Sequence, residues 1–199
     1  IESVSSDYQR WNLASFMGRV NYNYKDRYLL TVSARYDGSS RLAPGQKWVL
    51  FPSAALAWRV KEESFLKDVD CLSNLKLRLG WGITGNTAID PYKTQGSLEY
   101  GRYSYGSNGV LAFYQKEMPN PNLSWEKTEQ WNTGIDFGFL NGRIGGSVDL
   151  YLQNTNDLLM DRQLPVVSGF GNVTTNIGQI RNKGLEVTLN TVNIDTKDF

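Results

Sequence analysis

The sequence predicts an all-β fold, an antiparallel up-and-down sheet in which each strand lies beside the next one along the chain. Three observations predict it: apolar and polar residues alternate with period two, the alternating segments are long, and their connections alternate between short and long. Most segments are about 8–10 residues long, above the common strand length of about 5–6. The seven segments are 15–24, 28–37, 53–60, 75–84, 130–139, 144–153 and 185–191.

Each segment has one apolar and one polar face. In the first, Phe16, Val20 and Tyr22 alternate with Arg19 and Asn21. Successive side chains of a strand point to opposite sides, so this spacing collects the apolar residues on one face. The later apolar faces are Tyr28, Leu30, Val32, Ala34 and Tyr36; Ala54, Leu56, Trp58 and Val60; Leu75, Leu77, Leu79, Trp81 and Ile83; Trp131, Thr133, Ile135, Phe137 and Phe139; Ile144, Gly146, Val148, Leu150 and Leu152; and Leu185, Val187 and Leu189.

The connections predict two unlike rims. Residues 25–27 and 140–143 are short turns, whereas 38–52, 86–128 and 155–183 are long. In an up-and-down sheet the short connections lie at one end and the long ones at the other, as in outer-membrane barrels. The connection 61–74 is longer than that rule requires.

The tight turn also predicts the register of its hairpin. Asn-Gly is a strong signal for a two-residue type I′ turn, here Asn141-Gly142. Such a turn places Ile135 opposite Val148 and Phe137 opposite Gly146, both on the apolar face. A slip of one residue would move polar side chains into that layer.

Alternation alone is compatible with two environments for the apolar face. In a membrane barrel it meets lipid, and in a soluble β-sandwich it packs against a second sheet. Tyrosines at both ends of 28–36 favour the membrane, because eight residue steps on a tilted strand rise about 20 Å along the membrane normal. The residues that would then face lipid are Phe16, Val20, Leu30, Val32, Leu77, Leu79, Ile135 and Val148. The alternative is a soluble or surface-exposed sandwich that binds carbohydrate.

Composition excludes several classes of site. The chain of 199 residues has no histidine and one cysteine, Cys71, so it lacks the residues for His-dependent catalysis, a Cys-based zinc site or an internal disulfide. The net charge of +1 argues against a nucleic-acid binder. No apolar run is long enough for a transmembrane helix, and no signal peptide is visible at the start of the sequence. We expect no cofactor and no metal.

Two patterns that could carry chemistry have simpler readings. Residues 80–85 match G-x-G-x-x-G, but the motif lies inside an alternating strand, whereas a dinucleotide site needs it between a strand and a helix. Asp136 and Asp149 are predicted diagonal neighbours on one hairpin, about 7–8 Å apart, a spacing that an inverting glycosidase could use. Carboxylates on a wet surface are common, so we expect no catalytic residues and a protein that is not an enzyme.

The long connection 86–128 is rich in tyrosine, interspersed with Gly and Ser. Aromatic faces stack on sugar rings and pack on peptides, and the tyrosine hydroxyl adds a polar contact. The candidate ligand-contacting residues are Tyr92, Tyr100, Tyr103, Tyr105, Tyr114 and Trp125. The simpler interpretation is a loop that packs on its neighbours.

Several strings, in order along most of the chain, resemble the C-terminal part of the barrel of SusC/RagA-type TonB-linked outer-membrane receptors of Bacteroidetes. The strings are Arg27-Tyr28-Leu29-Leu30, Arg35-Tyr36-Asp37-Gly38-Ser39-Ser40-Arg41, Phe51-Pro52-Ser53, Glu63-Ser64-Phe65-Leu66, Leu75-Lys76-Leu77-Arg78, Gly82-Ile83-Thr84-Gly85-Asn86, Asn122-Leu123-Ser124-Trp125-Glu126-Lys127-Thr128, Gly134-Ile135-Asp136-Phe137-Gly138, Asp157-Leu158-Leu159, Asn176-Ile177-Gly178 and Asn182-Lys183-Gly184-Leu185-Glu186.

The resemblance implies a 22-stranded outer-membrane barrel of which residues 1–199 are a partial domain, without the plug, the TonB box and the final strand. It implies import of a large nutrient, an oligosaccharide or a peptide, energised through TonB and capped by a SusD-type surface lipoprotein. It assigns no ligand residue in this part of the barrel. About seven strands are too few to close a membrane barrel, so we expect an open sheet with free edges near 13–24 and 184–193.

Overall fold

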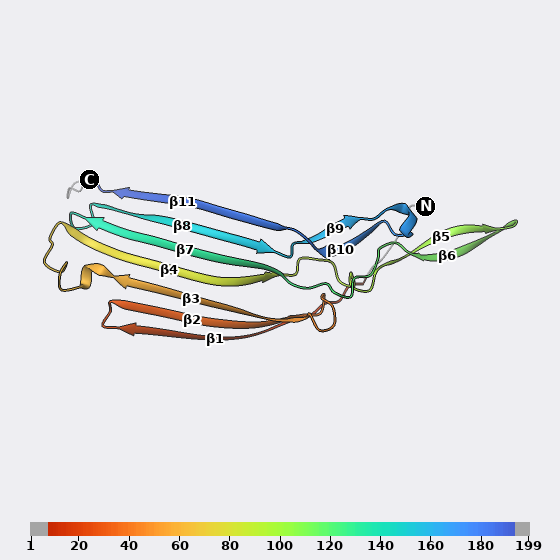
Figure 1. The fold of residues 1–199 in the computed structure, drawn as a ribbon, viewed down its shortest axis with the longest axis horizontal. Coiled ribbons are helices and arrows are strands. Elements are labelled where there is room, and N and C mark those ends of the chain that lie inside the picture. The colour runs from red at the N-terminus through yellow and green to blue at the C-terminus, as the bar shows by residue number, and fades with distance from the viewer. Residues whose placement is uncertain (1–7, 194–199) are drawn as a thin grey trace.

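The computed structural model describes residues 8–193, and its main element is one open antiparallel sheet of seven strands (Figure 1). The strands are β1 (Leu13–Tyr24), β2 (Tyr28–Ser39), β3 (Trp48–Arg59), β4 (Leu72–Asn86), β7 (Glu126–Phe139), β8 (Ile144–Asn156) and β11 (Gln179–Thr191). They lie in the order β1-β2-β3-β4-β7-β8-β11, so each pairs with its predicted neighbour. All seven predicted strands are therefore present, and β1 and β11 form the two edges of the sheet, as expected.

Two further hairpins correct the sequence prediction. The segment 86–128, predicted as a loop, contains β5 (Leu98–Tyr105) paired with β6 (Asn108–Gln115), and 155–183 contains β9 (Leu159–Gln163) paired with β10 (Asn172–Asn176). The β5–β6 hairpin projects well beyond the end of the main sheet (Figure 1). The prediction missed it because its apolar residues lie on both faces, which obscures the period-two pattern.

The two ends of the sheet differ as predicted. The connections 25–27, 60–71 and 140–143 lie at one end, which we call the turn rim. The connections 40–47, 87–125 and 157–178, with both small hairpins, lie at the other end, the loop rim (Figure 1). The link 60–71, longer than the other two, begins with a short 3₁₀ turn, η1 (Val60–Glu62).

The predicted register of the β7–β8 hairpin is confirmed. Ile135 lies opposite Val148, and Phe137 lies opposite Gly146. Asn141 and Gly142 both have positive φ, at 57° and 86°, as a type I′ turn requires.

Strand β3 begins earlier than predicted, because it continues through Pro52. On the β2 side the ladder runs from Trp48 to Trp58, with Pro52 opposite Ala34. On the β4 side it begins only at Ser53, opposite Gly82. Proline has no N–H to donate to a neighbouring strand. This explains why the β3–β4 ladder begins only after Pro52.

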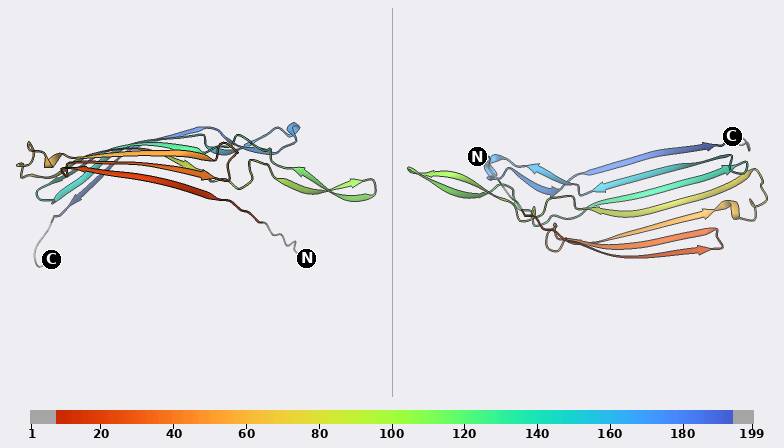
Figure 2. Two further views of the ribbon diagram at one scale, coloured as in Figure 1. Left: turned by 90° about the horizontal axis from the view of Figure 1, so that it is seen from below. Right: turned by 180° about the vertical axis from the view of Figure 1, so that it is seen from behind.

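Most of the apolar face of the sheet is uncovered. Val20 is 69% exposed and Leu79 is 47% exposed, although both lie in the middle of their strands. Seen edge-on, the seven strands form one curved layer (Figure 2). The soluble sandwich is therefore wrong, because its apolar residues would meet a second sheet. Among residues 8–193, no helix is long and apolar enough to cross a membrane.

The apolar band runs obliquely across the strands. One row of paired residues begins with Tyr24, Tyr28 and Trp58 beside the turn rim and ends at Val187, in the middle of β11. The second row from it towards the loop rim begins at Val20 and ends at the charged Lys183. Strands tilted to the membrane normal produce this drift, because a row perpendicular to them climbs through the bilayer.

A small buried cluster stands at the loop rim. It consists of Leu42, Phe51, Leu123 and Trp125, each at most 4% exposed. We call this cluster the rim core. The Trp125 indole Nε1 donates to the Lys47 carbonyl at 2.9 Å, and Gly85 lies so close that an added Cβ would meet the rings of Phe51 and Trp125. The rim core therefore ties the connection 40–47 to the segment that leads into β7.

Candidate functional site

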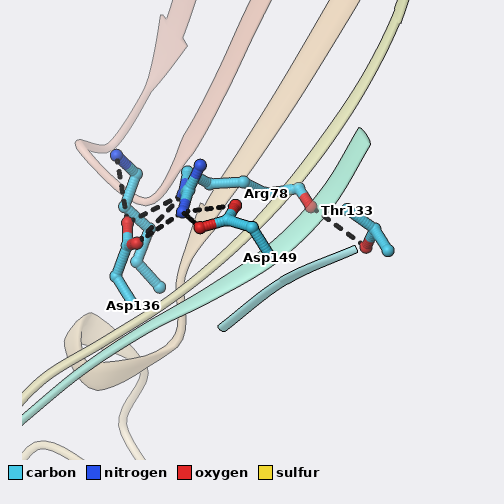
Figure 3. Close-up of polar contacts among 5 residues, drawn as sticks. Arg78, Thr133, Asp136 and Asp149 are labelled. Atoms are coloured by element: carbon cyan, nitrogen blue, oxygen red, sulfur yellow. Dashed lines mark hydrogen bonds and ion pairs between the residues drawn. The ribbon is translucent and has the colours of Figure 1, made fainter. Parts of the chain in front are cut away.

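An ion cluster lies on the polar face of the sheet, across three strands. The guanidinium of Arg78 on β4 donates from Nη2 to Asp136 Oδ1 at 2.7 Å and from Nε to Oδ2 at 2.9 Å, and its Nη2 lies 2.9 Å from Asp149 Oδ1 (Figure 3). Asp136 lies on β7 and Asp149 on β8. Lys76 Nζ is 3.9 Å from Asp136 Oδ2. The carboxylates are 25% and 16% exposed, so water reaches the cluster only in part.

The register brings these charges together. Lys76 pairs with Asp136, Arg78 pairs with Gly134, and Gly134 pairs with Asp149. A Cβ at position 134 would lie 2.2 Å from Asp149 Oδ1 and 2.9 Å from Arg78 Nη2, so the bare backbone leaves the space in which Arg78 reaches both acids. The predicted diagonal arrangement of the two aspartates is confirmed.

Arg78 changes what the two aspartates can do. Its guanidinium lies between the two carboxylates and binds both. A glycosidase pair needs that space for a sugar and a water molecule, and one carboxyl group that carries a proton. The arrangement fits a structural ion cluster, in which both acids accept hydrogen bonds from Arg78. Sequence reasoning did not single out Arg78, although its place on the polar face of 75–84 was a usable signal.

The predicted aromatic residues at the loop rim fall into three groups. Tyr100, Tyr103, Tyr105 and Tyr114 all lie on the β5–β6 hairpin and are 51–77% exposed. Tyr100 shares one face with Phe113, directly opposite it, and the other three lie on the opposite face with Val110. Both faces of this ribbon are therefore aromatic and open, an arrangement suited to contacts with another molecule.

Tyr92 lines a cavity at the base of the hairpin, with a volume of about 350 Å³. Its hydroxyl donates to the Arg10 carbonyl at 3.2 Å, and Lys93 forms an ion pair of 2.6 Å with Glu117. Burial lowers the pKa of Lys93, but the hydrogen bond and the charge of Glu117 outweigh it and raise the pKa. The cavity is lined by Gln9, Asp90, Pro91, Tyr92, Lys93, Gly96, Ser97 and Glu117. We call it the rim cavity.

Trp125 differs from the tyrosines. It is 3% exposed, and its ring packs edge-on against Phe51 at a centroid distance of 5.3 Å. Its indole N–H is already bonded to the chain. Among the six candidate residues, Trp125 thus holds the rim together, and the five tyrosines remain available to a ligand.

The glycine motif at 80–85 lies within β4, as expected, and in the described part of the chain the next element after β4 is the strand β5, not a helix. Gly82 lies opposite Ser53, and Gly85 faces the rim core. These glycines serve close packing in the sheet.

Comparison with known proteins places this geometry in a family. A sequence model described as TonB dependent receptor-like, beta-barrel, matches residues 2–195. The chain belongs to this family. It is 48% identical to the TonB-dependent receptor SusC of Bacteroides thetaiotaomicron over 96% of its length, and 40% identical to the TonB-dependent receptor P26 of Formosa agariphila over 98%. It spans about a fifth of those relatives, 19% and 20% of their lengths.

Solved structures agree with this assignment. The chain matches the RagAB peptide importer in the "open-open" state with a TM-score of 0.84 and 31% identity, over 94% of this chain and 20% of that one. It matches the siderophore receptor PirA from Pseudomonas aeruginosa with a TM-score of 0.60 at 16% identity, over 90% of this chain and 31% of that one, a likeness of fold alone.

The family fixes the surroundings of the two faces. TonB-dependent receptor barrels lie in the outer membrane, so the open apolar face of this sheet is the membrane face and the polar face lines the lumen. The matches to SusC and RagAB confirm the sequence resemblance to SusC/RagA-type receptors. The Arg78 cluster accordingly lies inside the barrel.

Proposed function

We propose that this chain is a wall segment of an importer that carries a large nutrient, an oligosaccharide or a peptide, across the outer membrane. The observation that carries the proposal is the division of the sheet into a bare apolar face and a charged polar face, joined to a loop rim with five open tyrosines. A polar lumen admits hydrated solutes, and exposed aromatic side chains at its mouth bind sugar rings or peptide backbones.

The relatives support transport and leave two nutrient classes. RagAB is named as a peptide importer at 31% identity, and SusC is a TonB-dependent receptor at 48% identity. Tyrosine contacts suit both classes of ligand, because the ring packs on apolar surfaces and the hydroxyl bonds to polar groups.

The proposal includes parts that lie outside this chain. A plug closes the lumen, TonB supplies the energy that moves the plug, and a SusD-type lipoprotein caps the loop rim. The Arg78 cluster places positive and negative charges close together on the lumen wall. A polar plug can pack against such a surface without burying a large apolar area.

Growth of a strain that lacks the receptor gene tests the proposal. Full-length receptor should restore growth on an oligosaccharide mixture or on an oligopeptide mixture as the sole carbon source, and deletion of tonB should abolish that growth. Replacing Tyr100, Tyr103, Tyr105 and Tyr114 together by Ser should slow uptake while the barrel still reaches the outer membrane. Unchanged uptake with all four replaced would show that these tyrosines do not contact the ligand. Growth of the complemented strain on neither mixture would reject both nutrient classes.

A further inference from the structure

The link 60–71 is bonded to the strands β2 and β3 at the turn rim. It is held by one carboxylate: Glu63 accepts hydrogen bonds from the Tyr28 hydroxyl at 2.7 Å, from the Trp58 indole at 3.1 Å and from Arg27 Nη1 at 3.1 Å. Tyr28 and Trp58 lie opposite each other on the membrane face and their rings stack. Because Glu63 reaches both rings, the link lies against the membrane side of the wall.

The burial of the two strand ends supports the same placement. Val60, where η1 begins, is 7% exposed and Leu72, where β4 begins, is 9% exposed. Leu77, further along the membrane face of β4, is 36% exposed. The link bonds to both ends, through Glu63 N to the Val60 carbonyl and Leu72 N to the Val69 carbonyl. The apolar face is therefore covered where the link meets it.

The link itself is a compact structure. The ammonium of Lys61 donates to three carbonyls, those of Leu66 at 3.0 Å, Lys67 at 3.1 Å and Val69 at 2.7 Å. This side chain holds the turn closed from within. A turn with such internal bonding holds its side chains in defined directions.

Two apolar side chains of this compact turn face outward. Phe65 is 66% exposed and Val69 is 38% exposed. Phe65 lies two residues along the chain from Glu63, whose carboxylate binds the stacked pair Tyr28 and Trp58 on the membrane face. At this end of the sheet, the membrane is the apolar environment that an exposed phenylalanine can enter. Burial of a phenylalanine side chain from water is favourable, so it would help to hold a short link in the headgroup region.

We propose that the link 60–71 is an interfacial anchor that inserts Phe65, with Val69 beside it, into the phospholipid headgroup region of the periplasmic leaflet, and that Glu63 aims it there. The link is longer than the other two turns at this rim because it must fold back along the outside of the wall. This inference depends on the outer-membrane location and on neither the nutrient nor TonB.

The test is a depth measurement on the full-length receptor in vesicles of phosphatidylethanolamine and phosphatidylglycerol. Nitroxide labels are placed singly by Phe65→Cys, Leu79→Cys and Val166→Cys, with Cys71 and other cysteines replaced by Ser. Leu79 is the control for lipid, and Val166, 93% exposed at the loop rim, is the control for water. Power-saturation spectra then compare accessibility to oxygen, which concentrates in lipid, with accessibility to a water-soluble nickel chelate.

We expect the oxygen-to-nickel ratio at position 65 to lie several-fold above that at 166 and below that at 79. Adding Glu63→Ala should move position 65 towards the value at 166 while the barrel remains assembled, as judged by the unchanged label at 79. A label at 65 as accessible to nickel as that at 166 would overturn the anchor. So would a label shielded from both reagents, because Phe65 would then contact protein. An unchanged ratio in the Glu63→Ala receptor would overturn the role of Glu63.

Discussion

Apolar residues are exposed in the sheet but buried in the rim core. In the sheet, Val20 and Leu79 remain 69% and 47% exposed in the middle of their strands. At the loop rim, Leu123 and Trp125 are 0% and 3% exposed, as in the interior of a soluble protein. We interpret the difference as the effect of two solvents. The wall has lipid as its apolar surroundings, and the rim lies in water and therefore needs a buried core of its own.

The same difference appears in the polar groups. On the membrane face, the indoles of Trp81 and Trp131 both donate to Glu129 Oε1, at 2.9 and 3.1 Å, near the loop-rim boundary of the apolar band. In the lumen, the Arg78 cluster stays partly exposed to water. The carboxylate of Glu129 thus lies at the boundary of the membrane face, whereas the charged groups of the Arg78 cluster lie well inside the lumen wall.

The largest expected effect is in the rim core. Trp125→Ala should cost the loop rim about 3–5 kcal/mol, because it removes a fully buried aromatic ring and leaves a cavity. Limited proteolysis of the full-length receptor in detergent should show faster cleavage in 40–47 and 119–125. Tyr105→Ala, at a residue 77% exposed, is the control and should leave cleavage unchanged. Equal protection in both variants would mean that the rim has no core of its own.

Charge on the membrane face should have the next largest effect. Leu79→Arg should cost about 2–4 kcal/mol and reduce the receptor recovered in the outer membrane, because a charge in mid-bilayer is poorly solvated. Asn132→Arg is the matched control, since Asn132 pairs with Gly80, the neighbour of Leu79, but on the lumen side. Heat-modifiable migration on gels measures assembly. Equal recovery of the two variants would contradict the assignment of the faces.

Loss of the lumen ion cluster should have a smaller effect. Arg78→Leu leaves Asp136 and Asp149 without their shared partner, and we expect a loss of about 1 kcal/mol for each pair, since water reaches all three side chains. Adding Asp136→Asn and Asp149→Asn should recover most of that loss. Urea unfolding of the refolded receptor in lipid vesicles measures it. A triple variant less stable than Arg78→Leu alone would mean that the acids are stabilised by something other than Arg78.

The smallest effect is a pH dependence at the turn rim. The hydrogen bonds from Tyr28 and Trp58, with the charge of Arg27, hold the pKa of Glu63 below its ordinary value of 4.5. A lowered folded-state pKa contributes stability that is present above pH 4.5 and is lost as the pH falls through the folded-state pKa. Position 65 labelled with a nitroxide should therefore become more mobile in acid below pH 4.5. A Glu63→Gln receptor should lack this transition; its persistence there would assign the change to another group.

Much of the sheet was predictable because it depends on local patterns. The alternation of Leu75, Leu77 and Leu79 with Lys76 and Arg78 predicts a two-faced strand, and Asn141-Gly142 sets the register of β7 against β8. These signals need only neighbouring residues and the fixed geometry of a type I′ turn.

The missed features depend on contacts between distant segments. The sequence predicts Trp125 as a ligand candidate, but its burial depends on Phe51 and the Lys47 carbonyl, which only the fold brings near it. Arg78 meets Asp136 only once β4 pairs with β7 across the long connection 87–125, whose register no local turn sets. The β5–β6 hairpin escaped because both its faces are aromatic, so its apolar residues show no single face.

A label scan along one strand tests the central claim, that lipid contacts the apolar face of this sheet and water contacts the other. Nitroxides placed singly at residues 28–36 of β2 in the full-length receptor, in phospholipid vesicles, are measured for accessibility to oxygen and to a nickel chelate. We predict a period of two, with oxygen favoured at Leu30, Val32 and Ala34 and nickel favoured at Thr31 and Ser33. A profile without that period, or one in which both reagents are excluded from Leu30 and Val32, would contradict the assignment.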